Sequence, residues 1–335
     1  MNAQASAPTR GDAALIVAGP TASGKSALAM LLAERLGGVV INADSMQVYR
    51  DLRILTARPT PAEEAAVPHA LYGVRDAADA ASAGWWRGAA LAAMDEARTA
   101  GRLPILCGGT GLWLSALVNG IGAIPPVPEA MRQEARALAA AIGAAALHAR
   151  LAAADPATAS RLQPGDTQRV IRAWEVLQAT GEGLSTWWSR RAEPPAPWRA
   201  AMILLAPPRA PLRAAIDARF EAMVEAGAAE EVRALAARGL DPALPAMKAH
   251  GVPNIAAALA GRIPLARAIA EGQAMVRQYA KRQDTWFRHQ TIVPPTRLHT
   301  IHARFADLAQ FSEQERAILF AFIDSAGLTH RTNRA

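Results

Sequence analysis

A glycine-rich segment near the start of the chain carries the residue types that bind phosphate. Residues 19–26 read GPTASGKS and match the pattern G-x-x-x-x-G-K-[ST]. In this pattern backbone N–H groups face an anion, the lysine reaches the terminal phosphates and the hydroxyl residue binds Mg²⁺. The predicted phosphate-binding residues are Gly19, Pro20, Thr21, Ala22, Ser23, Gly24, Lys25 and Ser26, with Ser26 also the predicted metal ligand. The motif indicates a phosphate chain but does not identify the reaction.

One carboxylate is well placed for chemistry beside that loop. Asp44 follows a predicted strand at 39–43, so it lies at the carboxyl edge of the sheet, where open α/β folds bind ligands. There it can accept a proton from a nucleophile, or it can cap the next helix, and spacing leaves both interpretations open. The strand predicted at 103–107 ends in GGTG with no acid, which favours group transfer over ATP hydrolysis.

The elements around these residues alternate between strands and helices. An apolar run at 14–18 predicts a buried parallel strand before the loop, and helical spacing at 25–36 predicts a helix after it. Further strands are predicted at 39–43, 71–74, 103–107, 202–206 and 299–302. This alternation predicts an α/β fold, a P-loop NTPase-like parallel sheet core.

Proline-rich stretches interrupt the alternating pattern twice. After residues 125–128 the chain is predicted to be helical, without strands, to about Trp188, and the stretch 193–197 leads back to the core. We therefore predict a discontinuous core of residues 12–123 and 196–305 with C-terminal helices. An all-helical insertion domain occupies 124–195, and flexible tails occupy 1–11 and 315–335.

Composition limits the classes of function. Hydrophobic residues make up 51% of the 335 residues, which excludes a mainly disordered chain. The formal net charge of +7 is compatible with a polyanionic partner. The single cysteine, Cys107, excludes an intramolecular disulfide and a cysteine-based metal site and favours a reducing, cytoplasmic location. No signal peptide and no apolar run of membrane-spanning length is recognised, so we expect no membrane association.

Six segments, taken together and in order, resemble the tRNA dimethylallyltransferases, also called tRNA isopentenyltransferases. They are GPTASGKS (19–26), NADSMQVYR (42–50), GGTGLW (108–113), DTQRVIRAWEV (166–176), Arg219-Phe220 with Met223, and RQYAKRQDTWFR (277–288). The resemblance implies transfer of the dimethylallyl group of dimethylallyl diphosphate to N6 of adenosine 37, beside the tRNA anticodon, with release of diphosphate. It also implies Mg²⁺ as cofactor, and we expect a monomer.

The resemblance gives individual residues a role. The phosphate loop would hold the diphosphate, with Arg219 as a further contact. Asp44 would orient N6 and accept its proton, Thr110 would assist, and the target base would be extruded into the pocket. Contacts to the tRNA anticodon stem-loop are implied for Asp44, Ser45, Met46, Gln47, Thr110, Arg132, Gln168, Arg169, Val170, Ile171, Arg172, Lys281 and Arg282.

Helical spacing refines the expected RNA contacts. Gln168, Arg172 and Glu175 share one face of a predicted helix, whereas Val170 and Trp174 lie on the apolar face. The polar face suits RNA, although an ordinary solvated face has the same pattern. In residues 277–288 cations alternate with aromatics, and we expect the aromatics to point inward and the cations outward.

Other functions fit parts of the same pattern. A phosphate-loop small-molecule kinase also places an Asp after its second strand, and an adenylate prenyltransferase would use the same chemistry on a free nucleotide. A non-catalytic RNA-binding module is the third alternative, which retention of Lys25 and Asp44 disfavours. The chain departs from the family pattern at Leu55, Arg58, Val276 and the stretch AHGVP (249–253).

Overall fold

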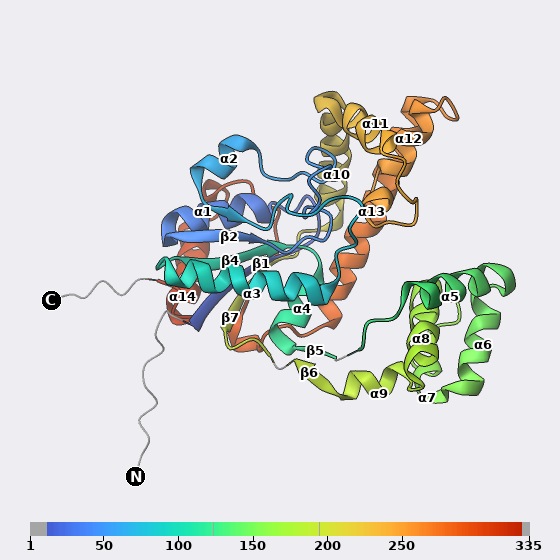
Figure 1. The fold of residues 1–335 in the computed structure, drawn as a ribbon. Coiled ribbons are helices and arrows are strands. Elements are labelled where there is room, and N and C mark those ends of the chain that lie inside the picture. Colours follow the sequence, from blue (N-terminus) through green and yellow to red (C-terminus); the bar gives the residue numbers. More distant parts are fainter. Residues whose placement is uncertain (1–11, 123, 194, 330–335) are drawn as a thin grey trace, which may run out of the picture. The chain divides into compact units, whose positions relative to one another are not determined.

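The computed structural model describes residues 12–122, 124–193 and 195–329. Contacts divide the chain into two compact units, a larger one of Met1–Val118 with Pro197–Ala335 and a smaller one of Asn119–Ala196 (Figure 1). The insertion predicted at 124–195 falls within the smaller unit. The predicted tail at 1–11 lies outside the described residues.

A parallel sheet forms the centre of the larger unit. Its strands are β1 (Ala13–Ala18), β2 (Gly38–Asn42), β3 (His69–Ala70), β4 (Leu103–Gly108), β7 (Arg199–Leu205) and β8 (Leu298–Ile301). The order is β3-β2-β4-β1-β7-β8, with every neighbouring pair parallel. Strands β1 and β4 are buried along their whole length, as expected for a parallel sheet covered on both faces. The predicted α/β class is confirmed.

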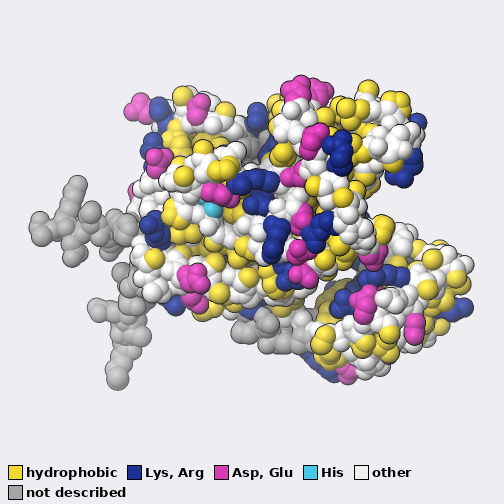
Figure 2. All heavy atoms as spheres, turned by 45° about the horizontal axis from the view of Figure 1, so that its top comes forward, with side chains coloured by type: hydrophobic (Ala, Val, Ile, Leu, Met, Phe, Trp, Pro, Cys, Tyr) yellow, Lys and Arg dark blue, Asp and Glu magenta, His cyan; other side chains and the backbone are white. Residues whose placement is uncertain are grey.

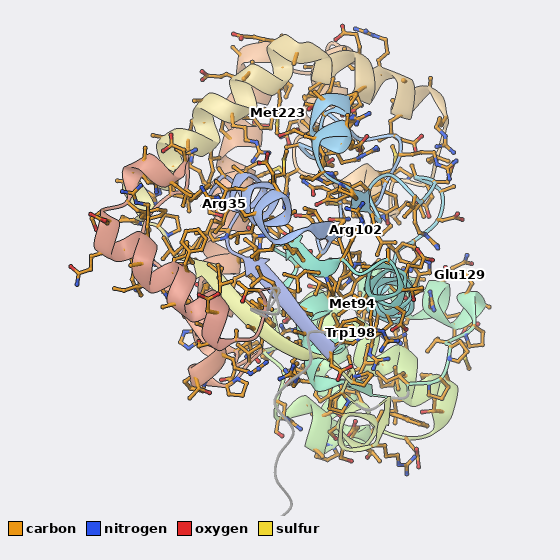
Figure 3. All side chains as sticks on the ribbon, turned by 90° about the vertical axis from the view of Figure 1, so that its left-hand side faces the viewer. Arg35, Met94, Arg102, Glu129, Trp198 and Met223 are labelled. Carbon is orange, nitrogen blue, oxygen red and sulfur yellow. The ribbon has the colours of Figure 1, made fainter. Side chains whose placement is uncertain are left out.

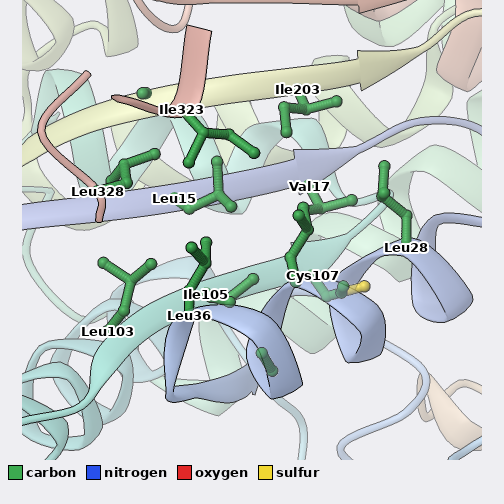
Figure 4. Close-up of a cluster of buried hydrophobic side chains, with 14 of the residues drawn as sticks. Leu15, Val17, Leu28, Leu36, Leu103, Ile105, Cys107, Ile203, Ile323 and Leu328 are labelled. Atoms are coloured by element: carbon green, nitrogen blue, oxygen red, sulfur yellow. The ribbon is translucent and has the colours of Figure 1, made fainter. Parts of the chain in front are cut away.

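Helices cover both faces of this sheet. The larger unit begins with α1 (Lys25–Leu36), α2 (Pro61–Ala66), α3 (Ala83–Thr99) and α4 (Gly111–Asn119). Figure 3 shows α3, which carries the buried Met94, and the C-terminal helix α14 (Glu313–Ser325) on opposite sides of β1. On the α14 side, Leu15 and Val17 pack with Leu28 of α1 and Ile323 of α14 (Figure 4).

Two predictions about the larger unit are wrong. The strand expected at 71–74 forms two residues earlier, as β3, because Leu71 and Gly73 adopt left-handed φ angles of 66° and 62° and turn the chain. Residues 315–329 are not a flexible tail. Helix α14 buries Leu319 and Ile323 in the core, and Leu328 is fully buried beyond it, while 330–335 lie outside the described residues.

A run of helices follows β7. Its members are α10 (Arg209–Met223), the π-helix η2 (Val224–Ala228), α11 (Ala229–Ala237), the 3₁₀ turn η3 (Ala246–Lys248), α12 (Val252–Leu259) and α13 (Leu265–His289). Gly227 inside η2 has φ 105°, so the chain kinks there. Two further 3₁₀ turns, η4 (Pro295–Arg297) and η5 (Leu308–Gln310), flank β8.

The smaller unit is mostly helical. It contains β5 (Ile121–Gly122), α5 (Glu129–Ile142), α6 (Ala144–Ala154), α7 (Pro156–Ala159), α8 (Thr167–Thr180), α9 (Leu184–Ser189) and β6 (Arg191–Glu193). Strands β5 and β6 pair as an antiparallel ribbon where the chain enters and leaves the unit. The expectation of an all-helical insertion is therefore wrong at 191–193, where backbone pairing with β5 makes the chain extended.

No single helix among the described residues is long and apolar enough to cross a bilayer, and α5 and α6 reach that length and apolarity only as a pair bent by 119°.

Candidate functional site

Three neighbouring strands end at one edge of the sheet and carry the predicted site residues. Strand β4 lies between β1 and β2. The phosphate loop follows β1, Asp44 follows β2, and Thr110 follows β4. Because the strands are parallel, these three segments meet at the carboxyl edge of the sheet, the usual ligand edge of such folds.

The phosphate loop has the backbone that its sequence requires. Gly24 has φ 91° and precedes the first turn of α1, and a Cβ there would lie 1.9 Å from the carbonyl oxygen of Phe305. Lys25 is buried, with Nζ 3.4 Å from the carbonyl oxygen of Pro20, which accepts its hydrogen bond. Burial lowers the pKa of Lys25, while Asp44 acts in the opposite direction. An ammonium group held in a dry site binds a diphosphate more strongly than an exposed one.

A segment far away in the sequence braces this loop. Phe305 donates its backbone N–H to the carbonyl oxygen of Ser23 at 2.9 Å, and Arg304 donates from Nε to that of Ala22 at 2.8 Å. The hydroxyl of Ser23 is buried and has no hydrogen-bond partner among the described residues. It is therefore a polar group available to a ligand in the loop.

Gln283 of α13 joins two of the three segments. Its Oε1 accepts from the backbone N–H of Thr21 at 2.9 Å, and its Nε2 donates to the carbonyl oxygen of Gly109 at 3.0 Å. The side chain is only 4% exposed. One amide thus fixes the phosphate loop relative to the turn that carries Thr110.

Asp44 belongs to a turn and does not cap a helix. Its Oδ1 accepts from the backbone N–H of Met46 at 2.9 Å, and no helix follows before α2. Asn42, which is buried, accepts from the N–H of Asp44 at 2.8 Å and donates to its carbonyl oxygen at 3.0 Å. Among the described residues the hydrogen bonds to the carboxylate involve Oδ1 alone, so Oδ2 is available to a substrate.

Thr110 connects the β2 and β4 ends. Its Oγ1 accepts from the backbone N–H of Ser45 at 2.9 Å and lies 3.3 Å from the hydroxyl of Ser45. Tyr279 of α13 hydrogen-bonds to the Thr110 side chain. Burial, with Asp44 nearby, raises the pKa of Tyr279, so its hydroxyl remains a hydrogen-bond donor.

A cavity opens beside these groups. Its polar lining includes Asp44, Arg219, His250 and Tyr279, and its apolar lining consists mainly of Leu55, Ile216, Phe220, Met223 and Val276. Thr21 and Ala22 of the phosphate loop and Met46 also line it. The cavity thus combines an anion site, a carboxylate and an apolar wall, as a substrate with a phosphate group and a hydrocarbon chain needs.

Arg219 lies between this cavity and a second hollow that Ser26 lines. Burial lowers the pKa of its guanidinium, and the nearby Asp44 opposes that shift. The group remains a cation at neutral pH, because arginine loses its proton only in strong base. Its position between the two hollows suits contact with a diphosphate.

The side chain of Gln47 is held by a neighbouring loop. Its Nε2 donates to the carbonyl oxygens of Thr56 and Ala57 at 2.8 and 3.0 Å. The carboxylate of Glu231 accepts the backbone N–H groups of Ile54 and Leu55 at 2.8 and 2.9 Å. Gln47 therefore holds the loop that forms part of the cavity wall, and its amide nitrogen is occupied.

The metal-binding prediction rests on Ser26 and the phosphates. Ser26 is exposed at the first turn of α1, and its hydroxyl interacts with Cys107. No group of three or more His, Cys, Asp or Glu side chains among the described residues could hold a metal ion. A serine hydroxyl with phosphate oxygens is a donor set that suits Mg²⁺, which is bound through substrate phosphates in many such sites.

The smaller unit holds several further predicted RNA contacts, on α8 and α5. Gln168 and Arg169 are exposed and Ile171 is half-buried, but Val170 is completely buried against Ala139 and Leu147. The side chain of Val170 is thus unavailable to RNA, contrary to expectation. The spacing had already placed it on the apolar face.

The expected polar face of α8 is also narrower than predicted. The side chain of Glu175 is 8% exposed and pairs with Arg172 at 3.1 Å. Glu175 is therefore not part of a free surface on α8. Arg132 of α5 pairs loosely with Glu129, at 3.7 Å.

Helix α13 confirms the expected orientation of its residues. Lys281 and Arg282 are exposed, Phe287 is buried and Tyr279 and Trp286 are half-buried. Arg282 lies over the ring of Tyr279, 5.7 Å from its centroid.

Sequence reasoning missed Gln283, His250 and the brace at 304–305. His250 lines the cavity, and its ring centroid lies 4.5 Å from that of Tyr279 with the two rings tilted by 49°. Its Nδ1 is buried and has no partner among the described residues. Burial lowers the pKa of His250, so the ring is neutral at pH 7. Gln283 lies four residues from both Tyr279 and Phe287, so it falls on the apolar face of α13, and this was the available signal for it. The other two had no such signal.

A parallel sheet with a phosphate loop after β1 and a carboxylate after β2, on the far side of β4, defines an α/β group-transfer enzyme. A family model described as IPP transferase matches residues 47–290, and one described as isopentenyl transferase matches residues 12–69. The chain belongs to the IPP transferase family and is a transferase.

Individual relatives agree with the family match. The chain is 56% identical over 310 residues to the tRNA dimethylallyltransferase of Granulibacter bethesdensis, covering 92% of this chain and 97% of that protein. It is 60% identical over 277 residues to that of Rhodospirillum centenum, covering 82% and 88%. The crystal structure of the full-length tRNA isopentenylpyrophosphate transferase from Bacillus halodurans matches this fold with a TM-score of 0.66. The two sequences are 32% identical, and the match covers 94% of this chain and 98% of that one.

A solved eukaryotic dimethylallyltransferase acting on tRNA is 25% identical, with TM-score 0.77, covering 97% of this chain and 82% of that one.

Proposed function

We propose that this transferase moves the dimethylallyl group of dimethylallyl diphosphate to N6 of adenosine 37, next to the anticodon of tRNA. A C–N bond forms at C1 of the donor as its C–O bond breaks, diphosphate leaves, and one N6 proton is lost. The observation that carries the proposal is the meeting of the phosphate loop, Asp44 and Thr110 at three adjacent strand ends beside one cavity.

The donor half of the reaction needs charge neutralisation. Negative charge builds up on the leaving diphosphate as its C–O bond breaks, and the loop amides, Lys25 and Arg219 stabilise it. The apolar wall formed by Leu55, Phe220 and Val276 holds the hydrocarbon chain and keeps water from the allylic carbon. When bound, Mg²⁺ supplies additional positive charge at the diphosphate, with Ser26 as its protein ligand.

The acceptor half of the reaction needs a proton acceptor. The free Oδ2 of Asp44 accepts the N6 proton, while the hydrogen bond from Met46 keeps Oδ1 in place. Thr110 and Tyr279 orient the amine or the diphosphate from the β4 side. The adenine must leave the anticodon-loop stack to reach this cavity.

We propose that RNA contacts come from both units. Gln168, Arg169 and Arg172 of α8 and Lys281 and Arg282 of α13 are the candidates, with Arg132, Ile171, Ser45 and Met46 as weaker ones. Phosphate contacts position the tRNA, and contacts to unstacked bases select it. We further propose that the protein works as a cytoplasmic monomer without membrane association; sedimentation in the presence and absence of tRNA tests the monomer.

One assay separates this reaction from the alternatives. The protein is incubated with labelled dimethylallyl diphosphate and either unmodified tRNA or AMP. We expect label in tRNA alone, on adenosine 37. Label in AMP would identify an adenylate prenyltransferase. No label in either, with ATP consumed on a small alcohol, would identify a kinase, and tRNA binding without any transfer would identify a binding module.

A further inference from the structure

A second groove lies between α10 and α13, separate from the Asp44 cavity. Along α10 its lining includes Arg209, Leu212 and Arg213, and along α13 it includes Arg277, Ala280 and Lys281. Both helices belong to the larger unit and pack on each other. The floor is apolar, since Leu212, Ile216 and Ala280 form one cluster with Ala22 of the phosphate loop.

The cations form two facing rows. Arg209 and Arg213 are four residues apart on α10, and Arg277 and Lys281 are four residues apart on α13, so each pair shares one helix face. A step of four residues advances about 6 Å along a helix. The groove therefore presents regularly spaced positive charge on both sides of an apolar floor.

The acids near the groove do not neutralise these rows. Asp217 pairs with Arg277, and Asp284 pairs with Arg288 at 2.7 Å. Arg209, Arg213 and Lys281 are exposed, and none of them has an ion-pair partner within the described part of the chain. Elsewhere cations and acids are mixed, as on the face that Figure 2 shows. Three uncompensated cations around one groove are thus a local feature.

We propose that this groove binds the ribose–phosphate backbone of the RNA substrate, on stretches of the chain other than the extruded adenosine. The phosphates lie along Arg209, Arg213 and Lys281, and the sugars contact the apolar floor. The inference rests on the proposed function, because it takes tRNA as the polyanion. A protein partner would be expected to bury more apolar area than this floor offers, whereas a backbone polyanion needs only the charge rows.

The salt dependence of binding tests the groove directly. The variant Arg209→Ala/Arg213→Ala removes two of the proposed phosphate contacts. The control Arg102→Ala/Arg316→Ala removes the same charge from exposed positions outside the groove. Arg102 lies at the amino end of β4, and Arg316 lies on α14. Affinity for unmodified tRNA is measured without donor at several salt concentrations.

Each phosphate contact contributes about 0.7–0.9 to the slope of log affinity against log salt. We expect the groove variant to lower that slope by about 1–2 and to weaken binding about 10-fold or more at physiological salt. The control is expected to keep the wild-type slope. A wild-type slope in the groove variant, or an equal loss in the control, would overturn the proposal.

Two more measurements keep the result interpretable. Thermal unfolding midpoints of both variants are expected to equal that of the wild type, because all four arginines are exposed. Transfer of label by the wild-type protein tests the proposed function separately. If the wild type binds tRNA but transfers nothing, the proposed reaction fails and the groove can still be judged from the slope.

Discussion

Gln283 donates a hydrogen bond to the carbonyl oxygen of Gly109, and a Cβ at Gly109 would lie 2.1 Å from the donating nitrogen. The same side chain accepts from Thr21 in the phosphate loop. The turn that carries Thr110 and the loop that binds the leaving group are thus positioned by one amide. Gln283 therefore influences the distance between the prenyl donor and the acceptor amine through the two segments that it holds.

Replacing Gln283 should reduce turnover more than binding. Gln283→Met leaves the Thr21 N–H and the Gly109 carbonyl unpaired, and we expect kcat to fall by about 10–100-fold, because small displacements of reacting groups are costly. The KM values for tRNA and donor should change much less. Steady-state kinetics with each substrate varied in turn measure both parameters. A rise in KM with normal kcat would contradict a positioning role.

Gln283→Glu provides a pH test of the same idea. A charged glutamate can accept from Thr21 but repels the Gly109 carbonyl, whereas a protonated one can donate to it as well. We expect the activity of this variant relative to wild type to rise as the pH is lowered from about 8 to about 5, since a buried carboxyl has a raised pKa. An activity ratio that does not change with pH would show that the hydrogen bond to the carbonyl oxygen of Gly109 does not contribute to catalysis.

Asp44 can be tested with a matched pair of substitutions. We expect Asp44→Ala to slow transfer by roughly 10²–10⁴-fold while tRNA binding stays nearly intact. Asp44→Asn keeps an acceptor for Met46 but cannot take a proton at neutral pH, so it should be equally slow. Single-turnover transfer assays give both rates. If the Asn variant remained fast, the turn geometry and not proton transfer would be the role of Asp44.

Arg169 and Arg172 should respond differently to replacement by alanine. The Arg169 side chain is 71% exposed, so its loss should reduce the salt dependence of tRNA binding without changing the unfolding temperature. The loss of Arg172 leaves Glu175 buried without its partner, so it should also lower that temperature. Filter binding at several salt concentrations and thermal scans separate the two effects. An Arg169 variant with the wild-type salt slope would rule this face out as an RNA contact.

Cys107 should be inert in the folded protein. Burial raises the pKa of its thiol from the usual 9.0 to about 11, so little thiolate forms at pH 8. Iodoacetamide should label Cys107 slowly until the protein is unfolded. Because the folded pKa is the higher one, stability contributed by this group is present below pH 9 and is lost between pH 9 and about 11. Cys107→Ala should therefore lose less stability than wild type over that range. Rapid labelling of the native protein would contradict this picture.

Helix α14 should matter for folding. Ile323 is fully buried in the core that contains Leu15 and Ile203, and Ile323→Ala should lower the free energy of unfolding by about 2–5 kcal/mol. Urea denaturation measures the change. The exposed Ile318 on the same helix is a control, since Ile318→Ala should change stability by less than about 1 kcal/mol. Equal effects at the two positions would mean that α14 does not belong to the core.

The sequence predicted the parts of the site that depend on local pattern. The phosphate loop and helix α1 follow from glycine spacing and helical periodicity. The places of Asp44 and Thr110 follow from strand ends and the alternation of the fold. Each of these features depends on neighbouring residues or on the order of elements along the chain.

Long-range contacts explain what the sequence did not predict. The pairing of Gln283 with Thr21 joins residues 262 positions apart, and nothing near either residue indicates it. The burial of Glu175 and α14 likewise depends on which helices pack over them. Asp44 shows where prediction from sequence ended. Its spacing fitted both a proton acceptor and a helix cap, and only the structure, in which no helix follows before α2, excluded the cap.

The contact of Gly24 and Ser23 with Phe305 has a consequence for biosynthesis. The loop is translated early, but the residues that brace it are added only after β8 has been made. A growing chain therefore exposes the loop and Asp44 before the phosphate-binding geometry is secured. Truncated translation products that end before Phe305 should for this reason be unable to consume the prenyl donor.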